Sequence, residues 1–297
     1  MYKRQAWYRK AFASPLGSEN KRIILCFDGV SSQMELWVNG TLIGEHVYGY
    51  TPFQFDITSA LNSNMIAVKT VNPGENSRWF AGAGIYRPVT LTMLSPVAIA
   101  PWGVYITTPD ISSDKATVHI ELKVSNKKDA DAEVGAEIRI SAPGNKEITM
   151  STDVITIGAN SIATLTVSGA IDEPALWHIN EPKLYSARVL LMEDGEELDH
   201  YRTKFGVRSI AYSVEDGFLL NGEEILMKGA CMHHDNGLLG AAAFPDAEYR
   251  RVKKMKENGY NAIRTSHNPP SESFLNACDE IGMLVVDESF DHWMKPK

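Results

Sequence analysis

Three clusters of polar side chains lie in the last third of the sequence, each shortly after an apolar run. Their members are His233, His234 and Asp235; Arg264, Ser266, His267 and Asn268; and Asp287, Glu288, Asp291 and His292. A polyol needs charged and neutral hydrogen-bond partners around its hydroxyl groups, and these clusters supply carboxylates, imidazoles, an amide and a guanidinium. The side-chain types therefore predict a site for a polyhydroxylated ligand.

Metal binding is the alternative that the clusters raise, because histidines and carboxylates are also metal ligands. The clusters lack an HExxH spacing and are spread over three segments, so we expect no metal and no cofactor. A single histidine among them could equally be a hydrogen-bonded core residue. That reading is weaker where three polar clusters are predicted on one face.

The segment 259–289 indicates which elements position the second and third clusters. An apolar run ends at Arg264, a Pro-Pro pair follows, and a helix pattern then leads to Gly282, a residue suited to end a helix. A second apolar run, 283–286, leads into the third cluster. This order is typical of a parallel β-α-β unit, which binds ligands beyond the carboxyl ends of its strands. We therefore expect the clusters to share one face.

The first cluster is expected to be positioned in the same way. A strand over 225–229 is predicted to precede it, and a helix is predicted to follow from the N-cap Asp246 to Gly259. The basic run 250–257 in this helix is interpreted as its solvated side. Three strands joined by two helices predict that residues 211–297 form the first part of a TIM (β/α)8 barrel.

An incomplete barrel leaves strand edges uncovered. We therefore expect exposed apolar edges around Ile263 and Val285.

Short alternating strands fill the part of the chain before residue 211. Asn39-Gly40 between two alternating runs predicts a hairpin, and residues 1–97 are expected to form an antiparallel, jelly-roll-like β-sandwich. Prolines near residue 97 mark a boundary, and the evenly spaced strands of 98–210 predict a second, immunoglobulin-like sandwich. The chain is thus predicted to be a multidomain, mainly β protein. In the first sandwich, Trp79 either faces a sugar or closes the end of the sandwich.

Composition excludes several classes of partner. The 297 residues carry 29 Lys and Arg against 37 Asp and Glu, a net charge of -8, which argues against a nucleic acid or an anionic membrane. No apolar run reaches the ~18 residues of a membrane span. Three widely spaced cysteines predict neither a disulfide framework nor a zinc site. The compartment stays open between the cytoplasm, the periplasm and the outside of the cell.

Several stretches of the sequence carry a family resemblance. The stretches NAIRTSHNPP, CDEIGMLVVDES and KGACMHHDNGLLGAA resemble the start of the barrel in glycoside hydrolase family 2, which contains β-galactosidases and β-glucuronidases. Upstream, WYRKAF, ELWVNG and SRWFAGAGIYR resemble the sugar-binding sandwich of that family. The stretches EPKLY and KFGVRSI resemble its immunoglobulin-like domain and junction. The resemblance covers essentially the whole chain.

The resemblance implies roles for individual residues. Arg264 and His267 match positions that line the pocket for the glycone, and His233 matches a sugar-contacting histidine. Asp287 and Glu288 match an acidic pair, of which Asp287 is expected to orient Arg264 or the pocket backbone. The resemblance also places Ser77, Arg78 and Trp79 in a sandwich loop that reaches toward the pocket.

The family's reaction is retaining hydrolysis by two glutamates, a nucleophile and an acid/base, with carboxyl groups ~5 Å apart. The resemblance implies that both glutamates lie beyond residue 297. No catalytic residue is therefore assigned, and this chain is expected to be an inactive fragment that also lacks sandwich strands before residue 7. Glu288 is not assigned as the nucleophile.

The expected substrate of the full-length enzyme is a terminal β-D-galactoside. A glucuronidase must pair a carboxylate, usually with Lys or Arg, and residues 229–245 contain neither. A β-glucuronidase, a β-mannosidase and a non-catalytic carbohydrate-binding module stay open as alternatives. A homo-oligomer also stays open.

Overall fold

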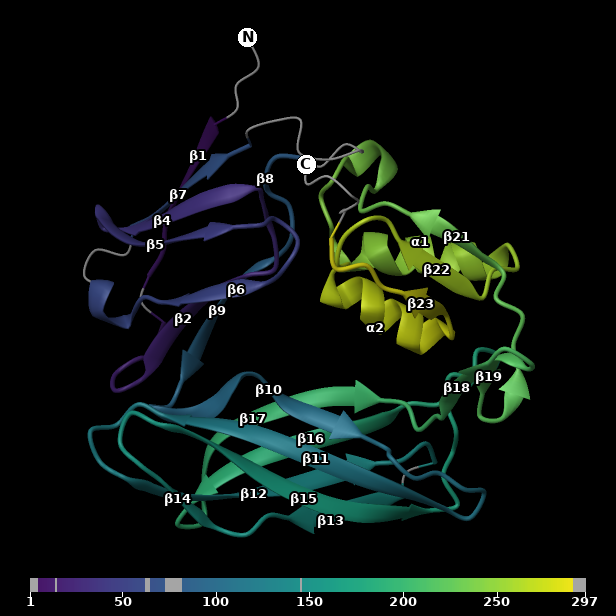
Figure 1. Ribbon diagram of the computed structural model, residues 1–297. Coiled ribbons are helices and arrows are strands. Elements are labelled where there is room, and N and C mark those ends of the chain that lie inside the picture. Colours follow the sequence, from purple (N-terminus) through teal and green to yellow (C-terminus); the bar gives the residue numbers. More distant parts are fainter. Residues whose placement is uncertain (1–4, 14, 62–64, 73–81, 145, 291–297) are drawn as a thin grey trace. The chain divides into compact units, whose positions relative to one another are not determined.

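The computed structural model describes residues 5–13, 15–61, 65–72, 82–144 and 146–290 (Figure 1). The chain is mainly β and divides into two compact units. The first combines Met1–Met93 with Lys228–Lys297, and the second is Leu94–Met227. Within the described part of the chain, no helix is both long enough and apolar enough to cross a membrane.

The N-terminal part of the first unit is a β-sandwich of two antiparallel sheets. One sheet has the order β1-β7-β4-β5, from Gln5–Ala11, Met65–Val71, Gln33–Val38 and Thr41–Val47. The other has the order β6-β2-β9, from Phe53–Asp56, Arg22–Phe27 and Val89–Leu94. Alternate residues of these strands, among them Phe27, Leu36 and Val38, form the core. The shorter strands β3 (Val30–Ser31) and β8 (Gly84–Ile85) pair with each other, and a 3-10 turn covers Thr58–Ala60.

The predicted hairpin between β4 and β5 is confirmed. Asn39 and Gly40 connect the strands with φ angles of 51° and 84°, as expected of a tight turn that needs left-handed backbone at both positions. The side chain of Asn39 also donates to the carbonyl of Ala60 at 2.7 Å and accepts from the amide of Met65 at 2.8 Å. This one asparagine therefore ties the hairpin to the neighbouring strand and turn.

The second unit is an immunoglobulin-like sandwich followed by a small antiparallel sheet. Its sheets are β10-β11-β15 and β13-β12-β16-β17, with β14 also paired to β12. The strands are Val97–Thr107 (β10), Lys115–Asn126 (β11), Ala132–Ser141 (β12), Glu147–Ser151 (β13), Ile155–Ile157 (β14), Ile162–Asp172 (β15), Tyr185–Glu193 (β16) and Glu196–Phe205 (β17). The small sheet contains Ile210–Ser213 (β18), Gly217–Leu220 (β19) and Glu223–Glu224 (β20). Trp177 is fully buried, and the guanidinium of Arg208 lies over its ring at 4.5 Å from the centroid.

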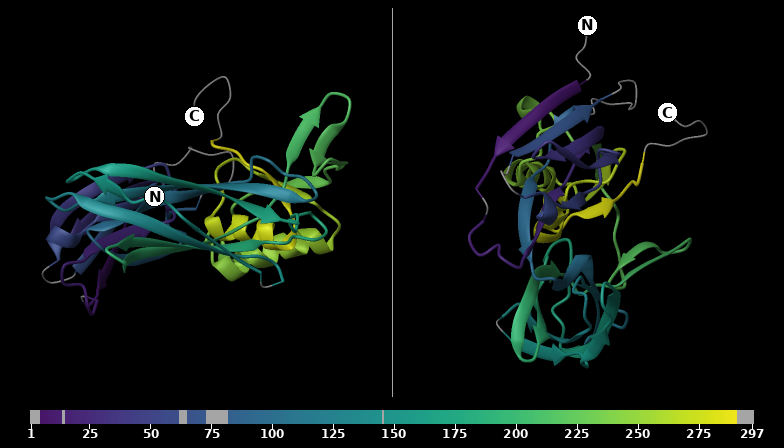
Figure 2. Two further views of the ribbon diagram at one scale, coloured as in Figure 1. Left: turned by 90° about the horizontal axis from the view of Figure 1, so that it is seen from below. Right: turned by 90° about the vertical axis from the view of Figure 1, so that its left-hand side faces the viewer.

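The C-terminal part of the first unit is the beginning of the barrel. Its strands β21 (Gly229–Met232), β22 (Ala262–Thr265) and β23 (Leu284–Val286) are parallel and adjacent in that order. Helices α1 (Pro245–Glu257) and α2 (Glu272–Ile281) connect them and pack side by side against the sheet (Figures 1 and 2). Val252, Ile263 and Phe274 form the centre of this small core.

Two local predictions for this part are wrong. The first barrel strand begins at Gly229 rather than at Ile225. Helix α1 begins at Pro245, with Phe244 as the N-cap, so Asp246 lies in the first turn instead of capping it. Proline suits the first helical position because its missing amide proton has no partner there in any helix.

The exposed apolar edges predicted for the barrel are also placed wrongly. Ile263 is completely buried and Val285 packs against the same core, because both side chains point toward the helices. The opposite face of the sheet is the uncovered one, and there Arg264 and Val286 are exposed. Alternation along the strands separates these two faces.

The second helix ends as predicted. Gly282 is its C-cap in the left-handed conformation, with φ 81°. Ser271 is its N-cap and accepts from the amide of Phe274 at 3.2 Å. The loop 266–271 is therefore held at one end by β22 and at the other by this cap.

Candidate active site

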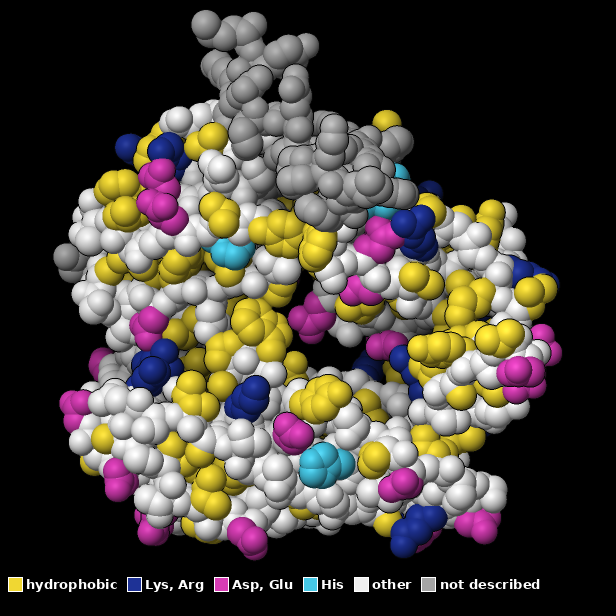
Figure 3. Space-filling model, viewed as in Figure 1, with side chains coloured by type: hydrophobic (Ala, Val, Ile, Leu, Met, Phe, Trp, Pro, Cys, Tyr) yellow, Lys and Arg dark blue, Asp and Glu magenta, His cyan; other side chains and the backbone are white. Residues whose placement is uncertain are grey.

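The carboxylate of Glu288 joins residues from two neighbouring strand ends. Its Oε1 accepts from Nε of Arg264, and its Oε2 lies 2.8 Å from Nδ1 of His267. The main-chain amide of Glu288 donates to Oγ1 of Thr265 at 3.1 Å. The loops after β22 and β23 are thus tied together, and the pKa of Arg264 is raised by its bond to Glu288. Figure 3 shows histidine, basic and acidic side chains gathered near the end of β21.

Asp287 was expected to orient either Arg264 or the backbone of the pocket, and the first alternative is wrong because Glu288 bonds Arg264 instead. Strand register explains the difference. Arg264 is paired with Val286 across the parallel ladder, and the side chain two residues further on, Glu288, points to the same face. Asp287 points to the other face, where its Oδ1 accepts from Thr265 at 3.0 Å.

His233 lies beside this ionic cluster. Its ring is edge-on to that of His267, with 5.4 Å between the centroids and 86° between the planes. Burial lowers the pKa of His233, and the neighbouring His267 lowers it further, while Asp235 acts in the opposite direction. The imidazole of His233 is therefore favoured in its neutral form, which can both donate and accept a hydrogen bond.

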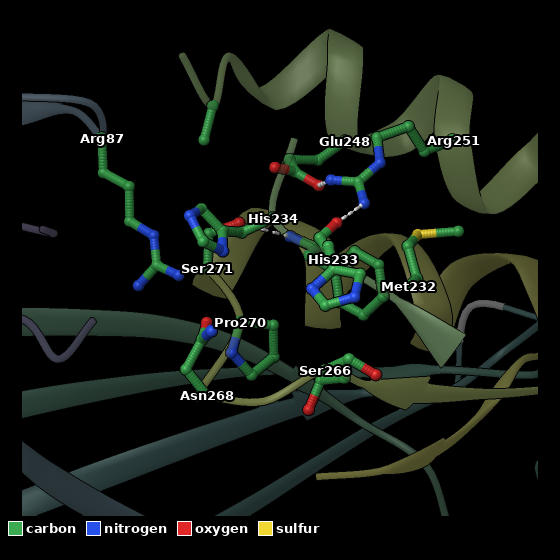
Figure 4. A pocket seen from close by; sticks show the side chains of 13 residues that line it. Arg87, Met232, His233, His234, Glu248, Arg251, Ser266, Asn268, Pro270 and Ser271 are labelled. Carbon is green, nitrogen blue, oxygen red and sulfur yellow. Dashed lines mark hydrogen bonds and ion pairs between the residues drawn. The ribbon is translucent and has the colours of Figure 1, made fainter. Parts of the chain in front are cut away.

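A buried ion pair beneath His233 was not predicted from the sequence. Glu248 is 3% exposed and its Oε2 lies 3.1 Å from Nη1 of Arg251, which also donates to the main-chain carbonyl of His233 (Figure 4). The interpretation of the run 250–257 as solvated is therefore wrong for Arg251. The spacing of three residues between Glu248 and Arg251, beside the buried Val252, is the signal that could have identified the pair.

His234 has a different environment from His233. Its ring is buried and lies against Tyr50 and Tyr86 of the sandwich, at centroid distances of 5.1 and 5.8 Å. It therefore packs between the two parts of the first unit and does not join the cluster around Glu288.

Some of the predicted site residues lie outside the described part of the chain. They are Ser77, Arg78 and Trp79 of the sandwich loop, and Asp291 and His292 of the third cluster. Among the side chains that the structure does describe, no three His, Cys, Asp or Glu are grouped closely enough to hold a metal ion.

Taken together, His233, Arg264, His267 and Glu288 lie at the carboxyl ends of three parallel strands. They present an imidazole that favours the neutral form, a guanidinium and a carboxylate to the uncovered side of the sheet. Such a set suits recognition of several hydroxyl groups at once.

Three sequence profiles of one enzyme family match successive parts of the chain. Glycosyl hydrolases family 2, sugar binding domain, matches residues 1–95; glycosyl hydrolases family 2 matches 102–208; and glycosyl hydrolases family 2, TIM barrel domain, matches 213–292.

Individual proteins are similar over nearly the whole chain. A β-galactosidase of Bacteroides ovatus is 35% identical over 98% of this chain and 35% of its own length. A β-glucuronidase of Bacteroides fragilis is 30% identical over 95% of this chain and 42% of its own length. The crystal structure of a family 2 member from Bacteroides cellulosilyticus superposes with a TM-score of 0.92 and 40% identity, over 96% of this chain and 40% of that one. The chain thus spans less than half the length of these relatives.

Proposed function

We propose, on the premise that this chain belongs to glycosyl hydrolase family 2, that it forms the glycone-binding part of a retaining β-galactosidase. In this proposal His233, Arg264 and His267 contact the sugar hydroxyls. Glu288 holds Arg264 and His267 in place, and Asp287 fixes the backbone through Thr265. Trp79 is proposed to add an aromatic sugar contact from the sandwich.

The observation that carries the proposal is the convergence on Glu288. Residues from neighbouring strand ends share one carboxylate, and His233 reaches the same place from a third strand. The Arg264 side chain is 46% exposed. Its Nε and Nη2 face Glu288 and its Nη1 donates to Sγ of Cys231 at 3.8 Å, which leaves N–H groups of the two terminal nitrogens for a ligand.

A galactoside is favoured over a glucuronide by the charge of the first loop. Residues 229–245 contain neither lysine nor arginine that could pair a substrate carboxylate. Both activities are named among the relatives, so a glucuronidase is the alternative of the same class.

A non-catalytic carbohydrate-binding module is the alternative of another class. It would leave β21 to β23 and their helices without a role. Their core, centred on Ile263, and the ionic cluster at their strand ends favour the enzyme.

The decisive experiment compares two substrates. The complete reading frame that contains this chain should be expressed and assayed on p-nitrophenyl β-D-galactoside and on the corresponding glucuronide. We expect faster turnover of the galactoside, and a preference for the glucuronide would overturn the proposal. The 297-residue chain alone is expected to release no nitrophenol. Arg264→Ala should lower kcat/KM on the galactoside at least about tenfold, since a hydrogen bond to a charged group contributes roughly 1.5–3 kcal/mol.

A further inference from the structure

The sandwich of the first unit contacts each of the three loops that carry the candidate site. The Tyr48 hydroxyl donates to the carbonyl of Ser289, after β23. The carbonyl of Tyr86 accepts from the amide of Ala243 at 2.8 Å, in the segment after β21. The third contact runs from Arg87 to the carbonyl of Pro269, in the loop after β22 and two residues beyond His267.

Arg87 has a buried guanidinium group, which donates hydrogen bonds both to the sandwich and to the barrel part of the first unit. It is 5% exposed. Nη1 donates to the carbonyls of Tyr50 at 2.6 Å and Asp28 at 3.4 Å, both in the sandwich. Nη2 donates to the carbonyl of Pro269 at 2.8 Å, in the barrel. A planar fork can reach both sides at once, whereas a lysine ammonium is a single point charge.

The loop that Arg87 grips contains His267 and two prolines. Prolines lack an amide proton, so 269 and 270 donate no main-chain hydrogen bond that could hold the loop. The ends of the loop are fixed by β22 and by the Ser271 cap, and the carbonyl of Pro269 lies between them. In Figure 4, Arg87 extends toward Asn268 and Ser271.

The sandwich leaves room for Arg87. Gly29 lies against it, and a Cβ at this position would come within 2.8 Å of Cδ of Arg87 and 3.0 Å of the Gly49 carbonyl. A side chain at residue 29 would therefore press on the guanidinium stem. The hydroxyl of Tyr86 donates to the same Gly49 carbonyl at 2.9 Å, which keeps that backbone in place.

We propose that Arg87 is a positioning residue for the candidate site: it fixes the loop 266–271 and thereby holds His267 against Glu288. The sugar-binding consequence of this role rests on the proposed function, while the loop-ordering role does not. In this proposal the sandwich restricts the motion of the barrel loop 266–271 through Arg87.

The test compares Arg87→Met with Arg22→Met in the 297-residue chain. Arg22 pairs with Asp56 inside the sandwich, with 2.8 Å between Nη2 and Oδ2, and serves as the matched control. Amide hydrogen exchange is measured along the chain. The reporter is the amide of Ser266, which donates to the carbonyl of Met232 at 3.0 Å. We expect Arg87→Met to accelerate its exchange about tenfold, because local opening of the loop becomes easier, with little change in β2 and β4. Arg22→Met should leave the loop unchanged, and Arg87→Lys should give an intermediate rate.

The outcomes separate the two proposals. Unchanged exchange at Ser266 overturns the role of Arg87. Equal acceleration throughout the sandwich also overturns it, because that result would indicate a merely structural residue. If Arg87→Met does not fold, Arg87→Lys is judged by the same comparison. Binding of methyl β-D-galactoside, followed by ligand-observed NMR, is the separate readout for the sugar. Its absence in the unsubstituted chain counts against the proposed function and leaves the exchange result decisive for Arg87.

Discussion

Oε2 of Glu288 lies 2.8 Å from Nδ1 of His267, while the other oxygen of the same carboxylate accepts from Arg264. One acidic side chain therefore orders two others that come from the neighbouring strand and its loop. Because the Glu288 side chain is only 18% exposed, its charge is poorly solvated and its two partners compensate for the lost hydration.

Glu288→Gln tests this arrangement. An amide can still accept one hydrogen bond, but it lacks the charge and the second equivalent oxygen, so both partners should become less ordered. In the complete enzyme we expect kcat/KM on the galactoside to fall by about ten- to a hundredfold, from loss of roughly 1.5–3 kcal/mol. Asp287→Asn is the matched control, since Asp287 bonds Thr265 on the other face. Equal losses for the two variants would contradict the assigned role of Glu288.

His233 should make stability depend on pH. Burial and the neighbouring His267 lower its pKa, while Arg251 acts in the same direction and Asp235 opposes them. The unfolded chain then binds the proton more tightly than the folded chain. Stability is therefore complete above the unfolded pKa of about 6.5 and is lost as the pH falls below it. Urea denaturation of the original chain and His233→Gln at a series of pH values should show a steeper acid loss in the former, and parallel curves would refute the prediction.

The sequence predicted the parts of this site that follow from local pattern. Parallel strands joined by helices place their carboxyl ends at one edge, so the clusters of His233, Arg264 and Glu288 had to be neighbours. Gly282 ends its helix and Asn39-Gly40 form their hairpin because left-handed backbone strongly restricts the residue type.

The contacts that depend on register or on distant packing could not be predicted in the same way. Glu288 pairs with Arg264 because β23 is aligned with β22 as Val286 to Arg264, and a shift of one residue would have presented Asp287 instead. Arg87 reaches Pro269 across 182 residues of sequence, and no periodic pattern indicates such a contact.

Asn39 and Asn20 offer a comparison of two asparagines with left-handed backbone, at φ 51° and 59°. Alanine at either position should cost about 1 kcal/mol for the strained conformation. Asn39→Ala should cost roughly 2 kcal/mol more, because it also removes the bonds to Ala60 and Met65. Free energies of unfolding from urea denaturation would measure both costs. Equal costs would show that the two side-chain bonds contribute nothing net.

Arg251→Met should be the most destabilising of the changes considered. It leaves the carboxylate of Glu248 buried without its cation, which costs roughly 3–5 kcal/mol, and it removes the bond to the His233 carbonyl. The double variant with Glu248→Leu should recover part of the loss, because it no longer buries a charge. Lys254→Met, which breaks the exposed pair with Glu257 on the same helix, should cost less than about 1 kcal/mol. Urea denaturation of the original chain, of the single variants Arg251→Met and Glu248→Leu and of the double variant gives the coupling energy. Strictly additive single effects would mean that Glu248 and Arg251 do not act as a pair.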